Sequence, residues 1–163
     1  LYALFDCSDP DVYVLHEERD GNIWESDAVE LFFWPDPSNP IYYEFEVGPT
    51  NAVFDARMVN SGSGGFQRWA RWNSKIETAV EVRGTVNLWR DRDEGYTVEI
   101  AIPIMAFEDV NGKRPLAGQT WKFAAVRVDL SVTLKAEERS STAIVPEGDI
   151  HQKDGYGDLT FQK

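Results

Sequence analysis

Residues 24–34 read Trp-Glu-Ser-Asp-Ala-Val-Glu-Leu-Phe-Phe-Trp, and this stretch decides how the chain folds. Over its last seven residues the side chains alternate between the two faces of an extended chain, which groups Val29, Leu31 and Phe33 together. Glu30 falls on the opposite face. The alternation predicts a β-strand whose apolar face packs against a core.

Asp27 opens this strand on the apolar face. An ionised carboxylate left alone in such a position costs several kcal/mol, so Asp27 must be protonated, paired with a cation or bound to a metal. Calcium prefers carboxylate and carbonyl oxygens from loops and strand ends, and no EF-hand spacing is present, so a calcium site would have to be assembled across strands. The alternative is a salt bridge from Asp27 to an arginine such as Arg57 or Arg127.

The same period-two pattern recurs in short runs bounded by Gly, Pro, Asn and Asp along most of the chain. A short helical turn is expected around residues 104–107, and residues 130–156 are expected to form a loop over one end of the sheets, a candidate rim for a binding site. The pattern predicts an all-β antiparallel sandwich or barrel that spans residues 1–163 as a single domain. Strands are expected at residues 1–6, 11–16, 28–34, 41–48, 51–59, 76–83, 85–90, 95–102, 120–130 and 157–162.

The composition excludes several classes of partner. With 28 acidic and 16 basic residues the net charge is −12, which repels nucleic acids and anionic membranes. The sequence contains no apolar run of 18 or more residues, so it predicts no helix that crosses a membrane. Cys7 is the only cysteine, so neither an intrachain disulfide nor a zinc site of thiolate ligands is expected. The chain starts directly in a strand pattern at residues 1–5, without a signal peptide, so we expect a piece of a longer protein that lacks one or more earlier strands.

No motif of a common enzyme class is present, neither a nucleophile elbow nor a phosphate-binding loop nor a zinc-binding helix. A pair of carboxylates is enough to catalyse the hydrolysis of a glycosidic bond, but nearly every β protein offers such a pair. The sequence therefore predicts a protein that is not an enzyme. A haem site would need axial ligands from His16, His151, Met58 or Met105. These residues occupy unrelated positions, and core packing is the better interpretation of both methionines.

The six tryptophans are many for 163 residues. An exposed indole offers a flat face on which a sugar ring can stack. Trp121 alternates with Phe123 in a strand and is expected in the core. Trp24 precedes Glu25 and follows a polar loop, so it is the best candidate for a ligand platform, with packing at the rim of the sandwich as the alternative.

Several segments in succession resemble one known family across nearly the whole chain. Each segment is short, but their order and spacing are similar to those of carbohydrate-binding module family 9 and its DOMON-like relatives. The segments are residues 1–6, 24–32, 42–47, 95–103, 118–123, 126–129 and 156–161.

The resemblance implies a β-sandwich that binds sugar without catalysis, often at chain ends, frequently with calcium, in secreted or surface proteins. Trp24 lies near the expected stacking aromatic, and Glu25 matches a position that hydrogen-bonds sugar hydroxyls. Asp27 and Glu30 match the acidic signature and are the candidate metal ligands. Where sugar binders of the family have an aromatic before the last strand, this chain has Ile150 and His151, and His151 is the candidate substitute.

The leading hypothesis is a non-catalytic carbohydrate-binding domain of a secreted, periplasmic or cell-surface protein, attached to other domains and stabilised by calcium. Its sugar, a mono- or oligosaccharide chain end, would rest on Trp24 and receive hydrogen bonds from Glu25, Arg127 and His151. The alternatives are a structural accessory domain with no sugar ligand, in which Trp24 is buried, and a DOMON-like haem-binding domain.

Overall fold

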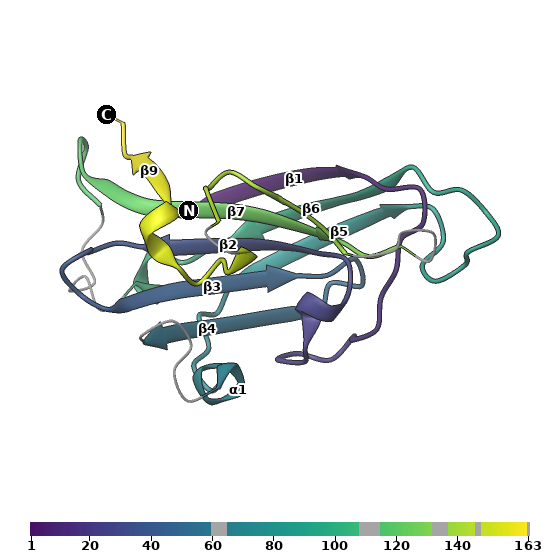
Figure 1. Ribbon diagram of the computed structural model, residues 1–163, viewed down its shortest axis with the longest axis horizontal. Helices are drawn as coiled ribbons and strands as arrows, with labels where there is room; N and C mark the ends of the chain where they lie inside the picture. Colours follow the sequence, from purple (N-terminus) through teal and green to yellow (C-terminus); the bar gives the residue numbers. More distant parts are fainter. Residues whose placement is uncertain (60–64, 108–114, 132–136, 146–147, 163) are drawn as a thin grey trace.

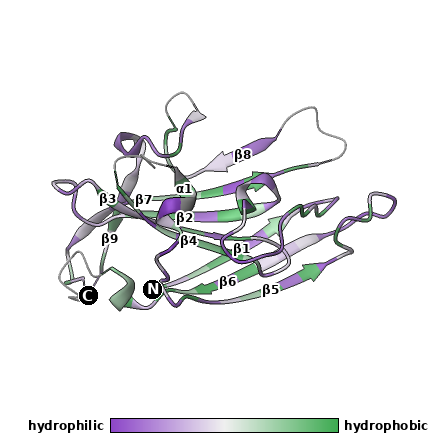
Figure 2. Cartoon of the chain, turned by 90° about the horizontal axis from the view of Figure 1, so that it is seen from below, coloured by the Kyte–Doolittle hydropathy of each residue, from purple (hydrophilic) through white to green (hydrophobic). Residues whose placement is uncertain are grey.

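The computed structural model (Figure 1) describes residues 1–59, 65–107, 115–131, 137–145 and 148–162. These residues form two antiparallel sheets packed face to face, which Figure 2 shows as two layers. The three-stranded sheet has the order β1 (Tyr2–Ser8), β6 (Gly95–Ala101), β5 (Glu77–Arg83). The larger sheet has the order β4 (Val53–Val59), β3 (Ile41–Val47), β2 (Ala28–Trp34), β7 (Thr120–Asp129), β8 (Glu138–Ser141), and β9 (Gly157–Thr160) also pairs with β7. The predicted all-β antiparallel sandwich is confirmed.

The larger sheet is buried on both faces. Its inner face meets the smaller sheet in a core to which β2 contributes Val29, Leu31 and Phe33, as its alternation predicts. Its outer face carries a second cluster with fully buried Phe32 and Phe54. Alternate residues of one strand therefore enter two different cores, and acids placed on either face are buried as well.

Short segments cover the outer face of the larger sheet. They are η1 (Ile23–Glu25), α1 (Phe66–Trp69) beside β4, and the chain around η5 (Lys153–Gly155). Ile23, Ile150 and Tyr156 from these segments are buried in the outer cluster. None of the described helices has the length and apolar character needed to cross a membrane.

Large side chains mostly lie where the sequence places them. Trp121 is 1% exposed in the inner core, as predicted, and Met58 is fully buried in the outer cluster. The expected helical turn is present as η2 (Ile104–Ala106). Met105 is 58% exposed on this turn, so the prediction that it packs in the core is wrong.

Eight of the ten predicted strands are present within a few residues of their expected ends, but the strand predicted at 11–16 is wrong. This segment has the apolar alternation of a strand, and its N–H groups bond to side chains instead of to a neighbouring strand. Side chains near the start of β2 and in the connection between β5 and β6 take the place of a partner strand. The acceptors are Asp93 for Val12 (2.8 Å), Asp27 for Tyr13 (2.6 Å), Asn87 for Val14 (2.8 Å), and Ser26 for Leu15 (2.8 Å) and His16 (3.2 Å).

The strand predicted at 85–90 is also wrong, because Asn87 adopts φ of 62° and turns the chain. Its side-chain amide accepts the N–H of Val14 and donates to the Val14 carbonyl oxygen at 2.9 Å. Strand β8 was missed within the predicted loop 130–156. All four of its residues are exposed and polar, so no apolar alternation marks it, and only backbone pairing with β7 makes it a strand.

We expect Asp93→Ala to lower the free energy of unfolding by about 3 kcal/mol, because it leaves the N–H groups of Val12 and Thr85 without their acceptor. Asp93 is 6% exposed, so water cannot fully replace the carboxylate. Urea denaturation measures the change. Asp91→Ala, at an exposed position in the same connection, is the control and should change stability by less than about 0.5 kcal/mol. Equal effects of the two substitutions would contradict this role of Asp93.

Candidate functional site

A pocket of about 260 Å³ opens on the outer face of the larger sheet. Its floor comes from β2, β3 and β4, and its walls come from η1, α1, β8 and the segment before η5. The lining residues are Trp24, Glu30, Glu44, Glu46, Phe54, Phe66, Arg139, Ile150 and His151. Aromatic walls around a floor of acids make this pocket the candidate functional site.

Aromatic rings form one side of the pocket. Trp24 is half-buried and packs edge-on against Phe54, with ring centroids 5.4 Å apart, and against Phe66 at 6.0 Å. His151 stacks on Phe66 with centroids 4.6 Å apart and planes inclined by 27°. Trp24 and His151 therefore both contact Phe66 in one pocket, although 126 residues separate them in the sequence.

His151 is held in a fixed orientation. Its Nδ1 lies 2.9 Å from Oη of the buried Tyr42 in a hydrogen bond, and its ring meets Phe32 edge-on. Burial lowers the pKa of His151 to about 4. The ring is therefore neutral at physiological pH and offers hydrogen bonds without a charge.

Three glutamates form the floor of the pocket. Glu30 of β2 and Glu46 of β3 are directly opposite across the two strands, and Glu44 is two residues from Glu46 on the same face. Each is 4% exposed or less. Burial raises the pKa of Glu30 to about 7 and that of Glu44 to about 8, and raises the pKa of Glu46 well above its usual range. Repulsion from Glu30 adds to the rise in pKa of Glu44, and repulsion from Glu44 and Glu30 adds to that of Glu46.

These carboxyl groups have few donors around them. Glu44 and Glu46 hydrogen-bond to each other, and Glu46 also accepts the backbone N–H of Trp24. One oxygen of each, Oε2, has no partner among the described residues. The Arg139 guanidinium favours ionisation of Glu30, but it is itself paired with Glu137. Buried polar atoms without partners are costly, so these oxygens are available to hydrogen-bond a group that enters the pocket.

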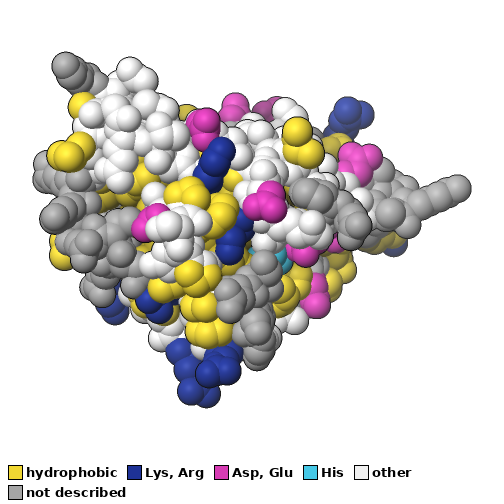
Figure 3. Space-filling view, turned by 60° about the vertical axis from the view of Figure 1, so that its left-hand side comes forward, with side chains coloured by type: hydrophobic (Ala, Val, Ile, Leu, Met, Phe, Trp, Pro, Cys, Tyr) yellow, Lys and Arg dark blue, Asp and Glu magenta, His cyan; other side chains and the backbone are white. Residues whose placement is uncertain are grey.

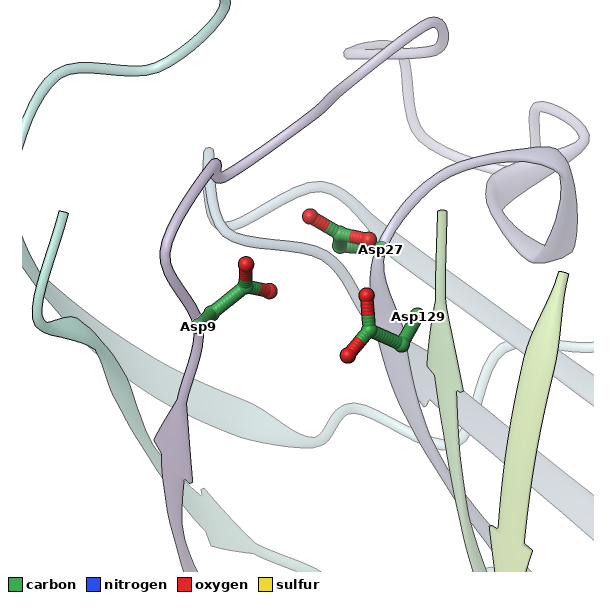
Figure 4. Close-up of side chains that lie close together, drawn as sticks. All are labelled: Asp9, Asp27 and Asp129. Carbon is green, nitrogen blue, oxygen red and sulfur yellow. The ribbon is translucent and has the colours of Figure 1, made fainter. Parts of the chain in front are cut away.

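A second acidic group lies between the sheets. Oxygens of Asp9, Asp27 and Asp129 are within 4.8 Å of one another, and no other set of three such ligand groups is this close among the described residues. Figure 4 shows the three side chains close together. Asp9 follows β1, Asp27 precedes β2, and Asp129 ends β7. The cluster therefore joins the two sheets at one end of the sandwich.

Asp27 is satisfied mainly by the backbone. Its oxygens accept the N–H groups of Tyr13 at 2.6 Å and Leu130 at 2.7 Å. Arg127 pairs with the other two acids, at 3.0 Å from Asp9 and 2.7 Å from Asp129. Burial, with smaller contributions from the two neighbouring acids, raises the pKa of Asp27 to about 8 although the two N–H groups favour its ionised form.

The structure brings together only some of the residues that the sequence singled out. Trp24 and His151 line the pocket as a pair. Arg127 belongs to the carboxylate cluster between the sheets. Glu25 is outside the pocket lining, exposed on η1, where it bonds Nε2 of His16 at 3.0 Å.

Glu30 and Asp27 also lie apart, because they project from opposite faces of the larger sheet, Glu30 into the pocket and Asp27 into the cluster. Sequence reasoning missed the other lining residues of the pocket. Of these, Glu44 and Glu46 alternate with Phe45, as Glu30 alternates with its apolar neighbours, so the same signal was present for them.

Other hollows on the surface lack this chemistry. A larger one, of about 550 Å³, lies on the outer face of the three-stranded sheet. Tyr2 and Leu4 in its lining are 92% and 66% exposed, so it is an open surface without buried polar groups. Figure 3 shows acidic and basic side chains interspersed with hydrophobic ones on one face of the molecule.

Comparisons with known proteins agree with this architecture. The family model described as "Carbohydrate family 9 binding domain-like" matches residues 1–131. A proposed carbohydrate-binding protein from Bacteroides uniformis is similar with a TM-score of 0.65 and 18% identity, over 99% of this chain and 71% of that one. Family 9 modules from Caldicellulosiruptor kristjanssonii, in complex with cellotriose and with glucose, give TM-scores of 0.64 and 0.62 at 15% and 17% identity, over 99% of this chain and 68% and 70% of theirs. No curated protein matches the chain.

We expect the ring of His151 to titrate with a pKa of about 4 in the folded protein, measured by NMR on its imidazole protons. An unfolded histidine titrates near pH 6.5, so the folded state binds fewer protons than the unfolded state between these values. His151 should therefore destabilise the fold as pH falls from about 6.5 to 4. His16→Gln leaves a single histidine and serves to assign the signal. A pKa near 6.5 for His151 would show that the ring is solvated.

Proposed function

The chain belongs to the carbohydrate family 9 binding domain-like family, and from this premise we propose that it is a non-catalytic module that binds the end of a sugar chain in the pocket on its outer face. The observation that carries the proposal is the joining of Trp24 and His151 in one pocket above buried acids. The complexes of the similar C. kristjanssonii modules with cellotriose and glucose support a sugar as the ligand.

The pocket has the two properties that sugar binding requires. A sugar ring has an apolar face of C–H bonds, and the half-buried Trp24 offers an aromatic surface for it. A sugar also carries hydroxyl donors, and Glu44 and Glu46 each present an oxygen without a partner among the described residues. Binding would thus relieve the cost of buried acceptors while it covers aromatic surface.

The size of the pocket favours a chain end. About 260 Å³ is at the small end of the range of ligand sites, which suits one ring more than the middle of a polymer. His151, neutral and held by Tyr42, takes the place of a second stacking aromatic and stabilises the wall through Phe66. Glu25 supports the rim through His16 and approaches only the part of a ligand that extends beyond the pocket.

We also propose that a divalent cation such as calcium binds at Asp9, Asp27 and Asp129. Three carboxylates within 4.8 Å are hard oxygen donors, and a single guanidinium, that of Arg127, leaves them with excess negative charge. The cation would favour the ionised form of Asp27 and stabilise the contact between the two sheets. This site is on the opposite face of the larger sheet from the sugar pocket. Glu30 acts in the pocket instead.

We further propose that the module works outside the cell as one part of a larger protein. A module that only binds sugar is useful where the sugar polymer lies, attached to domains that act on or anchor to that polymer.

The haem alternative receives no support from the described contacts, since Met58 is packed among apolar residues and Met105 is on a separate turn. Trp24 is half-buried in the lining of an open pocket, which favours ligand binding over the accessory role.

We expect glucose and cello-oligosaccharides to change the intrinsic tryptophan fluorescence and to raise the melting temperature. Trp24→Ala should weaken binding at least about tenfold, because it removes the aromatic surface that would carry the ring. Isothermal titration calorimetry measures the loss. Trp89→Ala is the matched control: Trp89 is 64% exposed, lies outside this pocket, and its removal should leave affinity unchanged. A broad sugar panel without response would refute the proposed function.

We expect calcium at millimolar concentration to raise the melting temperature of chelator-treated protein by about 5 °C. The rise should be larger at pH 8.5 than at pH 5.5, because protons compete with the cation for Asp27, whose pKa is about 8. Asp129→Asn should abolish most of the shift, whereas Asp91→Asn, at an exposed position, should retain it. If calcium, magnesium and manganese all fail to shift the wild type, the cation site is wrong.

A further inference from the structure

The floor of the pocket holds more carboxyl groups, at Glu30, Glu44 and Glu46, than the binding of a neutral sugar requires. Glu44 and Glu46 are both at least 96% buried, they bond to each other, and each has one oxygen, Oε2, without a partner in the described part of the chain. Glu30 is directly across from Glu46. Burial raises the pKa of Glu44 and Glu46, so in the unliganded protein both stay mostly protonated near neutral pH, and a cation bound beside them would let them ionise.

No cation of the protein neutralises this pair in the described structure. The guanidinium of Arg139 acts on Glu30 and is paired with Glu137. Lys153 lies over Trp34 and Tyr42, with its ammonium 4.8 and 4.6 Å from their ring centroids, and is not in the pocket lining. A metal ion is a poorer candidate, because the three glutamates do not come within the 4.8 Å spacing that Asp9, Asp27 and Asp129 satisfy among the described residues.

An organic ammonium group fits these surroundings better than a hydroxyl. It carries three N–H donors and a positive charge, and hydrogen bonds to charged groups are about twice as strong as neutral ones. Aromatic faces also attract cations, and the neighbours of the pair in the pocket include Trp24, Phe54 and Phe66. Carboxylates beside aromatic rings in a partly closed pocket are therefore typical of ammonium recognition.

We propose that the pocket selects an amino sugar, whose protonated amine binds between Glu44 and Glu46 while its ring rests against Trp24. The inference depends on the proposed sugar site and names the class of sugar that it prefers. The natural ligand is then the end of a polymer or oligosaccharide that contains 2-amino-2-deoxyhexose units with free amines.

The test compares glucose, glucosamine and N-acetylglucosamine by isothermal titration calorimetry at pH 7. The three sugars share the ring, but only glucosamine carries a positive charge. Glucosamine should bind at least about tenfold more tightly than glucose, since a charge-assisted hydrogen bond to a buried group is worth that factor. N-acetylglucosamine should lose this advantage.

Glu44→Gln and Glu46→Gln keep the shape of the side chains and remove one ionisable carboxyl each. Either substitution should reduce the affinity for glucosamine about tenfold and change that for glucose less than about threefold. Each should also raise the melting temperature of the unliganded protein above pH 8, because it removes a carboxyl whose burial, together with its acidic neighbours, raises its pKa and makes its ionisation costly. Glu99→Gln, exposed on β6 of the other sheet, controls for the change in net charge.

Three outcomes are distinct. A preference for glucosamine that both glutamine variants lose supports the inference. Equal or tighter binding of glucose, or a preference that survives both substitutions, overturns it and leaves the sugar site intact. Absence of binding by all three sugars and by cello-oligosaccharides overturns the proposed function together with the inference.

Discussion

Strand β2 lies in the middle of a sheet that is buried on both faces, and the rest of the structure depends on this double burial. The inner face is covered by the three-stranded sheet. Among the described residues no second sheet covers the outer face, and short segments from distant parts of the chain cover Phe32, Phe54 and their neighbours instead. They cover it incompletely, and the gap that they leave is the pocket. The candidate site is thus a by-product of how short segments cover an apolar sheet face.

The two groups of buried acids differ in how they are compensated. Asp27 and its neighbours receive backbone N–H groups and a guanidinium, so they hold the two sheets together. Glu44 and Glu46 receive little, so their desolvation is an unrelieved cost in the unliganded protein. A local arrangement that lowers the stability of the folded protein is typical of ligand-binding sites.

The sequence predicted most of the fold because period-two alternation follows directly from burial, and most strands of both sheets show it, with β8 as an exception. It failed where the partner of the backbone is a side chain: residues 11–16 alternate like a strand but bond to Ser26, Asp27, Asn87 and Asp93. The sequence singled out Trp24 and His151, and both line the pocket. It also grouped Glu30 with Asp27 as metal ligands and assigned Arg127 to the sugar, whereas Glu30 lies in the pocket and Arg127 lies in the carboxylate cluster. Period two correctly put Glu30 and Asp27 on opposite faces, yet it cannot tell which of two buried faces carries the ligand.

The hydrogen bonds of residues 11–16 also have a mechanical consequence. Apolar contacts between two sheets are not directional, so sheets packed by them alone can slide over each other at small cost. Here a connection that leaves the small sheet is bonded to the start of β2 and to the turn between β5 and β6, and each of these bonds has a fixed length and angle. The sandwich therefore resists shear at this end, because sliding one sheet over the other would have to break directional hydrogen bonds as well as apolar contacts.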